Sequence, residues 1–235
     1  MSEEESKLAV PLDKFLAAGV YVGLKYRTKF LKDYIYKIRP DGLAVLNIQK
    51  ISKRLEILSK FLSTFEPKDI LVVCRRDSGW GAVAEFCKVT GAKSCIGRYL
   101  SGTMTNSNYT EFFEPKIVFV CDPWVDRNAI KDAILINIPV VGLVDTNNTT
   151  NNIDLVLPCN NKGKKSLSLI FCAIAKEILK LRGQDPELAD IENFSKSVKG
   201  TKKLRTEDKE ESFEPRKRRT AFSRKPASRD REKSR

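Results

Sequence analysis

Short runs of consecutive apolar residues alternate with longer amphipathic segments through the middle of the chain. The apolar runs cover residues 70–74, 117–121, 140–144 and 155–157. Runs of this kind, without polar alternation, are typical of strands buried on both faces of a parallel sheet. We therefore predict an α/β fold with a doubly wound, Rossmann-like, mainly parallel sheet, helices on both faces and right-handed crossovers.

Helical periodicity and turn signals predict further elements around these strands. Residues 49–65 and 165–182 repeat apolar side chains every three or four positions, which indicates amphipathic helices. A short helix is expected at residues 11–18. Residues 33–38 and 43–48 are β-rich and flank a Pro-Asp-Gly turn, so we predict a hairpin there.

The distribution of charge divides the chain into parts. The net charge is +13, from 43 basic and 30 acidic residues, and residues 196–235 hold 16 of the basic and 7 of the acidic ones. That segment has little apolar surface to offset the entropy of ordering, so we predict that it is disordered when free. The predicted organisation is a polar lead over residues 1–9, one α/β domain over residues 10–195 and a basic tail over residues 196–235.

Several classes of protein are excluded or disfavoured by composition. The chain has no histidine, which excludes Ser-His-Asp and Cys-His mechanisms. Its six cysteines are scattered without a CxxC pair, which indicates buried thiols in a reducing compartment rather than a zinc site. No signal peptide and no apolar stretch of roughly 20 residues is present. We expect a cytoplasmic protein with no metal, no cofactor and no membrane partner.

Two turns resemble phosphate-binding loops, but neither motif is complete. Residues 74–81 lack the third glycine of GxGxxG and an acidic residue about 20 positions further on, so Ser78 is expected to cap a helix there while the glycines allow close packing. Residues 158–166 place Pro158 where a P-loop needs its first glycine. A nucleotide-binding α/β enzyme remains the alternative function.

Asp122 and Asp126 follow a predicted strand, at the end where α/β enzymes keep catalytic groups. No nucleophile or base accompanies these carboxylates. We therefore expect Asp126 to be a helix N-cap and catalysis to be the minor interpretation.

Three segments of the domain and two of the tail combine residue types that contact RNA. Residues 25–32 interleave cations with aromatic rings, which suits phosphate contact and base stacking, although a solvated face is the rival interpretation. Residues 98–106 are rich in hydroxyl and amide groups, which either satisfy their own turn or contact sugar and phosphate. Residues 160–166 place lysines beside Gly163 at a helix start, where an RNA phosphate or an acidic neighbour would fit; a solvated face is nearly as well supported. The predicted RNA-binding residues are Lys25, Arg27, Lys29, Lys32, Arg98, Thr103, Thr105, Asn106, Lys162, Lys164, Lys165, Arg216, Lys217, Arg218, Arg219, Arg224 and Lys225.

Several short segments occur together in the order found in one known family. They cover residues 18–23, 38–43, 97–98, 102–106, 114–115, 121–123, 137–139 and 158–163. Over residues 10–183 they make the chain resemble the universal ribosomal small-subunit protein two family. The resemblance is to its archaeal/eukaryotic branch, whose eukaryotic member is called SA or the laminin-receptor precursor.

The resemblance implies a Rossmann-like structural protein without enzymatic activity, near the head–body junction on the solvent side of the small ribosomal subunit. It implies contacts with small-subunit rRNA and neighbouring ribosomal proteins, in support of subunit assembly and translation. Bacterial members carry a long coiled-coil insertion, for which this chain has no room between residues 65 and 70. The eukaryotic form ends in an acidic extension, and this chain ends in a basic one, so the laminin-receptor activity is not implied. A free-standing RNA chaperone is a weaker third possibility.

Overall fold

The chain divides into two units, Met1–Lys199 and Gly200–Arg235, and the computed structural model describes residues 11–195 of the first. The predicted disorder of the tail lies outside the described residues. So do the predicted RNA contacts at Arg216, Lys217, Arg218, Arg219, Arg224 and Lys225.

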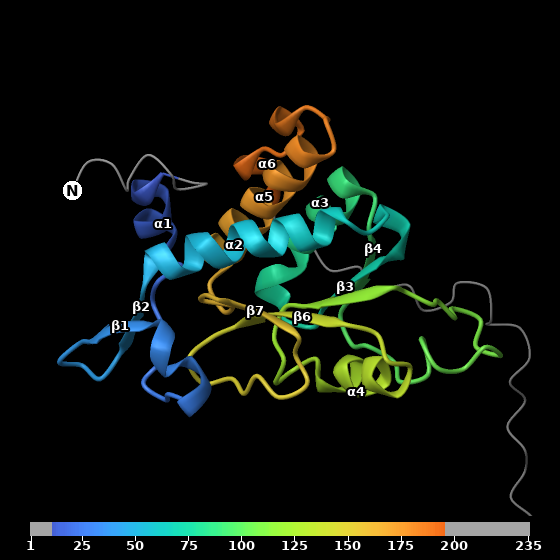
Figure 1. Ribbon diagram of the computed structural model, residues 1–235, viewed down its shortest axis with the longest axis horizontal. Helices are drawn as coiled ribbons and strands as arrows, with labels where there is room; N and C mark the ends of the chain where they lie inside the picture. The colour runs from blue at the N-terminus through green and yellow to red at the C-terminus, as the bar shows by residue number, and fades with distance from the viewer. Residues whose placement is uncertain (1–10, 196–235) are drawn as a thin grey trace, which may run out of the picture. The chain divides into compact units, whose positions relative to one another are not determined.

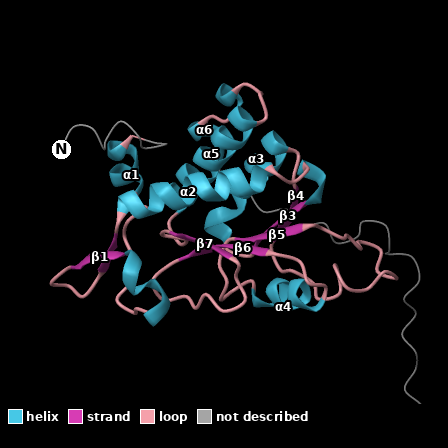
Figure 2. Cartoon of the chain, in the orientation of Figure 1, coloured by secondary structure: helices cyan, strands magenta, loops and turns pink. Residues whose placement is uncertain are grey.

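A five-stranded parallel sheet forms the centre of the described fold (Figures 1 and 2). Its strand order is β4-β3-β5-β6-β7, and every neighbouring pair is parallel. All residues of β3, β5 and β6 are buried, which is the physical reason for their unbroken apolar runs. The predicted α/β class is confirmed. The strands are β3 (Ile70–Cys74), β4 (Lys93–Ile96), β5 (Ile117–Val120), β6 (Val140–Val144) and β7 (Leu155–Pro158).

Strand β4 was not predicted from the sequence, because it lies at the edge of the sheet. Among the described strands it pairs only with β3, and its first two residues, Lys93 and Ser94, are exposed. A four-residue strand with two solvent-facing polar side chains carries no continuous apolar run.

Helices cover both faces of the sheet (Figure 1). α2 (Ile48–Ser63), α3 (Trp80–Thr90) and α5 (Lys164–Leu181) lie on one face, and α4 (Arg127–Leu135) lies on the other. The short helices α1 (Leu12–Ala18) and α6 (Ile191–Ser195) lie on the same side of the sheet as α5. Four 3-10 turns complete the helical elements of residues 11–195: η2 (Lys29–Tyr34), η3 (Pro67–Asp69), η4 (Asp77–Gly79) and η5 (Pro186–Leu188).

The larger hydrophobic core lies between the sheet and the three long helices. The Phe119 ring of β5 is 5.4 Å from the Phe171 ring of α5 and 6.3 Å from the Phe86 ring of α3, measured between centroids. A smaller core under α4 includes Val118 and Ala133. Burial on two faces therefore fixes the sheet between two helical layers.

The predicted hairpin is present but shorter than expected. β1 (Ile35–Ile38) pairs antiparallel with β2 (Ala44–Leu46) across a turn in which Gly42 has φ of +82°. Residues 33 and 34 belong instead to η2, and residue 48 begins α2, where Asn47 accepts hydrogen bonds from two backbone N–H groups of the first turn.

The predicted cap at Ser78 is wrong. The chain enters α3 through η4, and the Ser78 hydroxyl is buried with no hydrogen-bond partner among the described residues. The predicted close packing at the glycines holds for Gly79, where an added Cβ would lie 2.7 Å from Cys74 Sγ. Asp126 does occupy the N-cap position of α4, but its carboxylate accepts the backbone N–H of Arg75 instead of capping the helix.

All six cysteines are free thiols; five are buried and Cys95 is half-buried. Among the described residues, no cluster of three or more potential ligand side chains is placed to bind a metal ion. Within residues 11–195, no helix combines the length and the apolar character needed to cross a membrane.

Candidate nucleic-acid interface

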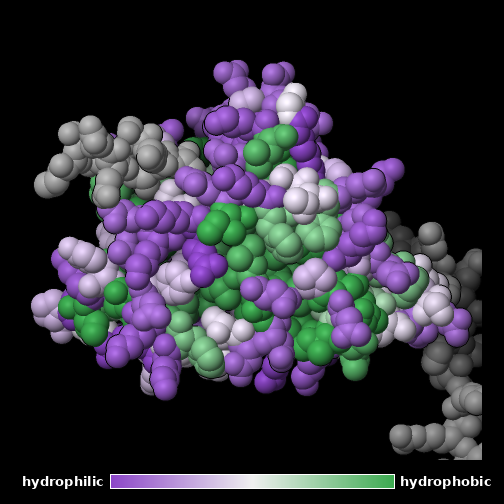
Figure 3. Space-filling view, in the orientation of Figure 1, coloured by the Kyte–Doolittle hydropathy of each residue, from purple (hydrophilic) through white to green (hydrophobic). Residues whose placement is uncertain are grey.

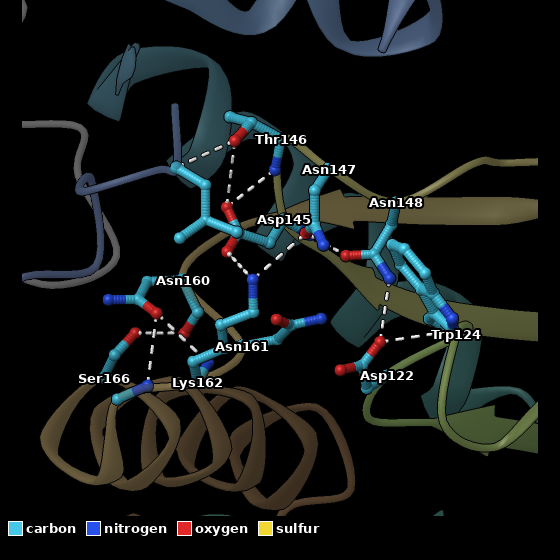
Figure 4. Close-up of polar contacts among 12 residues, drawn as sticks. Asp122, Trp124, Asp145, Thr146, Asn147, Asn148, Asn160, Asn161, Lys162 and Ser166 are labelled. Atoms are coloured by element: carbon cyan, nitrogen blue, oxygen red, sulfur yellow. Dashed lines mark hydrogen bonds and ion pairs between the residues drawn. The ribbon is translucent and has the colours of Figure 1, made fainter. Parts of the chain in front are cut away.

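The loops that follow β3, β5, β6 and β7 bring polar side chains together at the carboxyl end of the sheet. Figure 4 shows those of the loops after β5, β6 and β7. In open α/β sheets this is the edge at which ligands bind. Here the side chains from different loops pair with one another. These pairings decide which polar groups at this end of the sheet remain available to a ligand.

Asp122, directly after β5, is the centre of one set of contacts. Its carboxylate is 2% exposed and forms an ion pair with Arg76 from the loop after β3. It also accepts a hydrogen bond of 2.8 Å from the Asn148 side-chain amide and one of 3.1 Å from the Trp124 backbone N–H. A buried carboxylate with three donors is satisfied as it stands, and it needs no ligand.

Asp145, directly after β6, is the centre of the second set. Its carboxylate is 1% exposed and lies 3.2 Å from the Lys162 ammonium group, which also donates to the Asn147 side-chain oxygen at 3.1 Å (Figure 4). The Thr146 backbone N–H donates to the same carboxylate at 2.6 Å. Lys162, predicted to contact RNA, thus has two partners inside the protein and a side chain only 29% exposed.

A segment from near the N-terminus is bound to the loop after β6. The Leu24 N–H donates to the Thr146 hydroxyl at 2.9 Å, and the Thr28 N–H donates to the Thr146 carbonyl at 2.9 Å. The Thr28 hydroxyl donates to the Asn148 carbonyl at 2.8 Å. At Gly23 an added Cβ would lie 2.6 Å from Thr146 Cγ2, so only glycine allows this approach. The segment therefore covers the loop after β6, while a pocket beside the loop after β3 remains, lined by Arg75, Arg76, Asp77, Ser78, Val125 and Lys162.

The loop before α5 also forms internal hydrogen bonds, although the Asn161 side-chain oxygen is buried without a hydrogen-bond partner among the described residues. The Asn160 side-chain oxygen accepts the backbone N–H groups of Lys162 and Gly163, both at 3.1 Å. The N–H groups of Lys162 and Gly163 are thus already used within the loop, and assistance to phosphate binding by the backbone N–H groups near Gly163 stays a prediction. Lys164 and Lys165 in the first turn of α5 are exposed. Their contact with RNA or an acidic neighbour stays a prediction.

Residues 25–32 form the most exposed cationic segment of the candidate interface. Half of the predicted loop, from Lys29 onward, belongs to the 3-10 turn η2. Tyr26 is 82% and Phe30 is 53% exposed, while Leu31 is fully buried and anchors the turn. Thr28 fixes the middle of the segment through its two bonds to the loop after β6. All four predicted contact residues are exposed: Lys25, Arg27, Lys29 and Lys32.

Residues 98–106 lie beyond β4 and pack over α4. Asp132 of α4 is 7% exposed and accepts hydrogen bonds of 2.9 Å from the Tyr99 hydroxyl and the Gly102 N–H. Burial and this carboxylate together raise the pKa of Tyr99. The segment is thereby held in place as a structured turn.

The polar side chains of this turn divide into two groups. Thr103 donates to the Leu100 carbonyl at 2.7 Å, and Asn106 accepts the Asn108 N–H at 3.1 Å, so both satisfy the local turn. Arg98 and Thr105 are exposed. Asn106 is exposed as well, so Arg98, Thr105 and Asn106 all stay candidates for contact with RNA.

The structure also draws attention to residues that the sequence analysis passed over. Tyr36 is 70% exposed on β1, and it lines one pocket together with Arg27 and Lys32. The sequence signal for Tyr36 was its place on the exposed strand β1, which the sequence analysis had interpreted only as part of a hairpin. Asp145 and Asn148 were missed as well, although polar residues directly after a buried strand already mark the carboxyl end of a sheet.

The family model and the relatives found by comparison with known proteins all point to one family. The family model for ribosomal protein S2 matches residues 109–180. The protein is 45% identical over 185 residues to the small ribosomal subunit protein uS2 of Staphylothermus marinus, covering 79% of this chain and 84% of that protein. It is also 45% identical over 183 residues to uS2 of Methanococcus maripaludis strain C5, covering 78% and 82% of the two chains.

These matches agree with the family to which the motifs pointed and with its archaeal type. The family consists of structural proteins and not of enzymes. The chain belongs to the ribosomal protein S2 family.

Proposed function

We propose that this protein is a structural constituent of the small ribosomal subunit in the cytoplasm. In that role it binds small-subunit rRNA and neighbouring ribosomal proteins and supports subunit assembly and translation. The observation that carries the proposal is the 45% identity, over most of both chains, to proteins named small ribosomal subunit protein uS2.

The charges of the described surface support RNA as a partner. Lys25, Arg27, Lys29 and Lys32 project from one segment that is anchored by Leu31 and Thr28. Cations on an anchored segment lose less conformational freedom when they bind phosphates. Arg98, Lys164 and Lys165 are additional exposed candidates.

A charge-reversal experiment tests the proposal. In the full chain, Lys25, Arg27, Lys29 and Lys32 are changed together to glutamate, and incorporation into small subunits is followed by sedimentation at increasing salt. We expect the variant to dissociate at lower salt than the wild type, because four phosphate contacts are replaced by repulsion.

A matched control reverses four exposed lysines outside the candidate segments: Lys60, Lys68, Lys131 and Lys180. We expect this variant to stay with the subunit as the wild type does. Equal loss in both variants would mean that overall charge, and not residues 25–32, determines binding. Failure of the wild type itself to sediment with small subunits would refute the proposed function.

A further inference from the structure

The outer side of β1 and the cationic segment form one groove, which we call the β1 groove. It is lined by Arg27, Thr28, Lys29, Lys32, Ile35, Tyr36, Lys37 and Ile38. Four of these eight residues are cations, and none is acidic. The groove therefore joins residues of the cationic segment to strand residues that follow in sequence but had no predicted role in binding.

The aromatic ring of Tyr36 is displayed by an irregularity in the strand. Ile35 pairs with Leu46 and Lys37 pairs with Val45, so Tyr36 is an extra residue without a partner on β2. Such a bulge redirects a side chain and is common beside functional sites. The Tyr36 ring is 70% exposed and Ile38 is 52% exposed, next to the cations of the groove. Figure 3 shows a small hydrophobic patch at this hairpin, surrounded by hydrophilic side chains.

The groove is held in shape before any partner binds. Thr28 is bonded through both its backbone N–H and its hydroxyl to the loop after β6. Leu31 is fully buried under the same segment. On the other side, β2 is held between β1 and residues 21–24, through the bridge of Val22 to Val45. A preformed site loses little entropy on binding.

We propose that the β1 groove binds an unpaired nucleotide of single-stranded RNA, with the base stacked on Tyr36 and its flanking phosphates held by Arg27, Lys29, Lys32 and Lys37. This inference rests on the proposed function and names the RNA element that the site takes. An exposed aromatic face beside several cations is the combination by which proteins hold single strands, because every base has a π-face and every linkage carries a charge. Duplex RNA keeps its bases stacked and offers none to Tyr36.

An acidic peptide is the competing occupant, because within residues 11–195 β1 pairs only with β2 and has an open edge. The bulge at Tyr36 interrupts the regular spacing of hydrogen-bonding groups that an added strand needs. Lysine on an edge strand, here Lys37, also opposes strand addition. The geometry of the edge therefore favours a nucleotide over a strand.

The test uses the full chain and a labelled single-stranded oligouridylate of about eight nucleotides that contains 4-thiouridine, with binding followed by fluorescence anisotropy. Tyr36→Phe keeps the ring, whereas Tyr36→Leu keeps an apolar side chain but removes the π-face. We expect Tyr36→Phe to bind within about twofold of the wild type and Tyr36→Leu to bind about tenfold more weakly. An A-form duplex of the same length is expected to bind all three proteins equally.

Photocrosslinking locates the contact independently of the basic tail. We expect thiouridine crosslinks in the peptide that contains Tyr36. Wild-type affinity in Tyr36→Leu, or crosslinks confined to residues 196–235, would overturn the proposal. Binding of an acidic, leucine-containing decapeptide with no crosslink in the groove would overturn it in favour of the peptide.

The proposed function fails separately, because it depends on sedimentation of the wild type with small subunits. Tyr36→Leu is expected to remain in the subunit at low salt, since the other contacts persist. In those subunits one rRNA base is expected to become newly reactive to chemical probes. A reactivity pattern identical to that of the wild type would refute the nucleotide site and leave the ribosomal role intact.

Discussion

Lys162 shows how a residue can have the chemistry of an RNA contact and still be needed by the fold. Its ammonium group lies 3.2 Å from the carboxylate of Asp145, which is 1% exposed. Removing the lysine leaves that carboxylate without its counter-ion in a buried place. A role in the fold and a contact with RNA therefore predict different measurements.

We predict that Lys162→Met lowers the free energy of unfolding by about 1–3 kcal/mol, because an uncompensated buried carboxylate remains while the partly exposed lysine limits the loss. Urea denaturation measures the change. Lys164→Met is the matched control, two positions further on and exposed, with an expected change within about 0.5 kcal/mol. Equal effects in the two variants would show that the pair with Asp145 contributes nothing to stability.

Asp126 makes stability depend on pH near neutrality. Burial is the main cause that raises the pKa of its carboxyl group to about 7; the negative charge of Asp122 also raises this pKa, while backbone hydrogen bonds at Asp122 and Arg75 and the positive charge of Arg75 lower it. One of its oxygens is buried without a hydrogen-bond partner among the described residues. Because the folded-state pKa is above the unfolded value, the native state binds a proton that the unfolded chain has already lost.

We predict that the stabilisation from protonated Asp126 is complete below about pH 4 and is lost as the pH rises through about 7. In Asp126→Asn this contribution should disappear, so the wild type should lose stability relative to the variant between pH 5 and pH 7.5. Denaturation at several pH values measures the difference, and the absence of histidine keeps this window free of histidine titration. A difference that is constant across the window would contradict the raised pKa.

Among the elements, the N-terminal segment depends most on a contact between distant parts of the chain. Gly23 is buried against Thr146 of the loop after β6, and Leu24 and Thr28 donate to the same residue. This contact positions residues 25–32 and therefore one side of the β1 groove. A small change at Gly23 should therefore alter the position of the whole segment of residues 25–32.

We predict that Gly23→Ala lowers the free energy of unfolding by about 1–3 kcal/mol, since its Cβ would lie 2.6 Å from Thr146 Cγ2 and 3.1 Å from the Ala44 carbonyl oxygen. Hydrogen exchange at the N–H groups of Leu24 and Thr28 should become faster. Adding Thr146→Ser removes the clashing methyl group but keeps the hydroxyl, and should restore part of the loss. A double variant no more stable than Gly23→Ala would show that the methyl contact is not the cause.

At the scale of the whole molecule, residues 196–235 carry 16 basic and 7 acidic side chains, which is +9 of the net charge of +13. Residues 212–235 carry 10 basic and 3 acidic side chains, including the predicted contacts at Arg216, Lys217, Arg218, Arg219, Arg224 and Lys225. Each phosphate neutralised by such a residue makes the slope of log K, the association constant, against log salt concentration steeper by about 0.7–0.9. The tail can therefore be tested without knowledge of its structure.

We predict that changing these six residues to glutamine lowers the slope of log K against log salt concentration, for association with the subunit, by at least the amount of one phosphate contact, about 0.7–0.9. Association constants measured from low to high salt give the slope. The control changes Ser212, Thr220, Ser223 and Ser228 to glutamine, with charge retained and the slope expected to be unchanged. A wild-type slope in the six-residue variant would show that these side chains make no phosphate contacts.

Local pattern was sufficient for much of the fold, because burial on two faces leaves a direct signature in sequence. The strands at residues 70–74 and 140–144 begin and end as predicted, and α2 and α5 match within two residues at both of their ends. Edge strand β4 and the 3-10 turn that leads into α3 were not predicted, since exposed or irregular backbone has no strong periodicity. The positive charge of residues 25–32 was evident from the sequence alone.

What only the tertiary structure decided concerns side chains that are distant in sequence. The pairing of Lys162 with Asp145, and of Asn148 with Asp122, depends on neighbouring parallel strands ending at one edge of the sheet. The same packing brings Thr28 against Asn148 and makes Tyr36 part of a groove with Arg27. Sequence therefore determined which segments are buried and which are charged. The fold determined which charges are already neutralised within the protein and which remain available to a partner, because that depends on distances set by strand order.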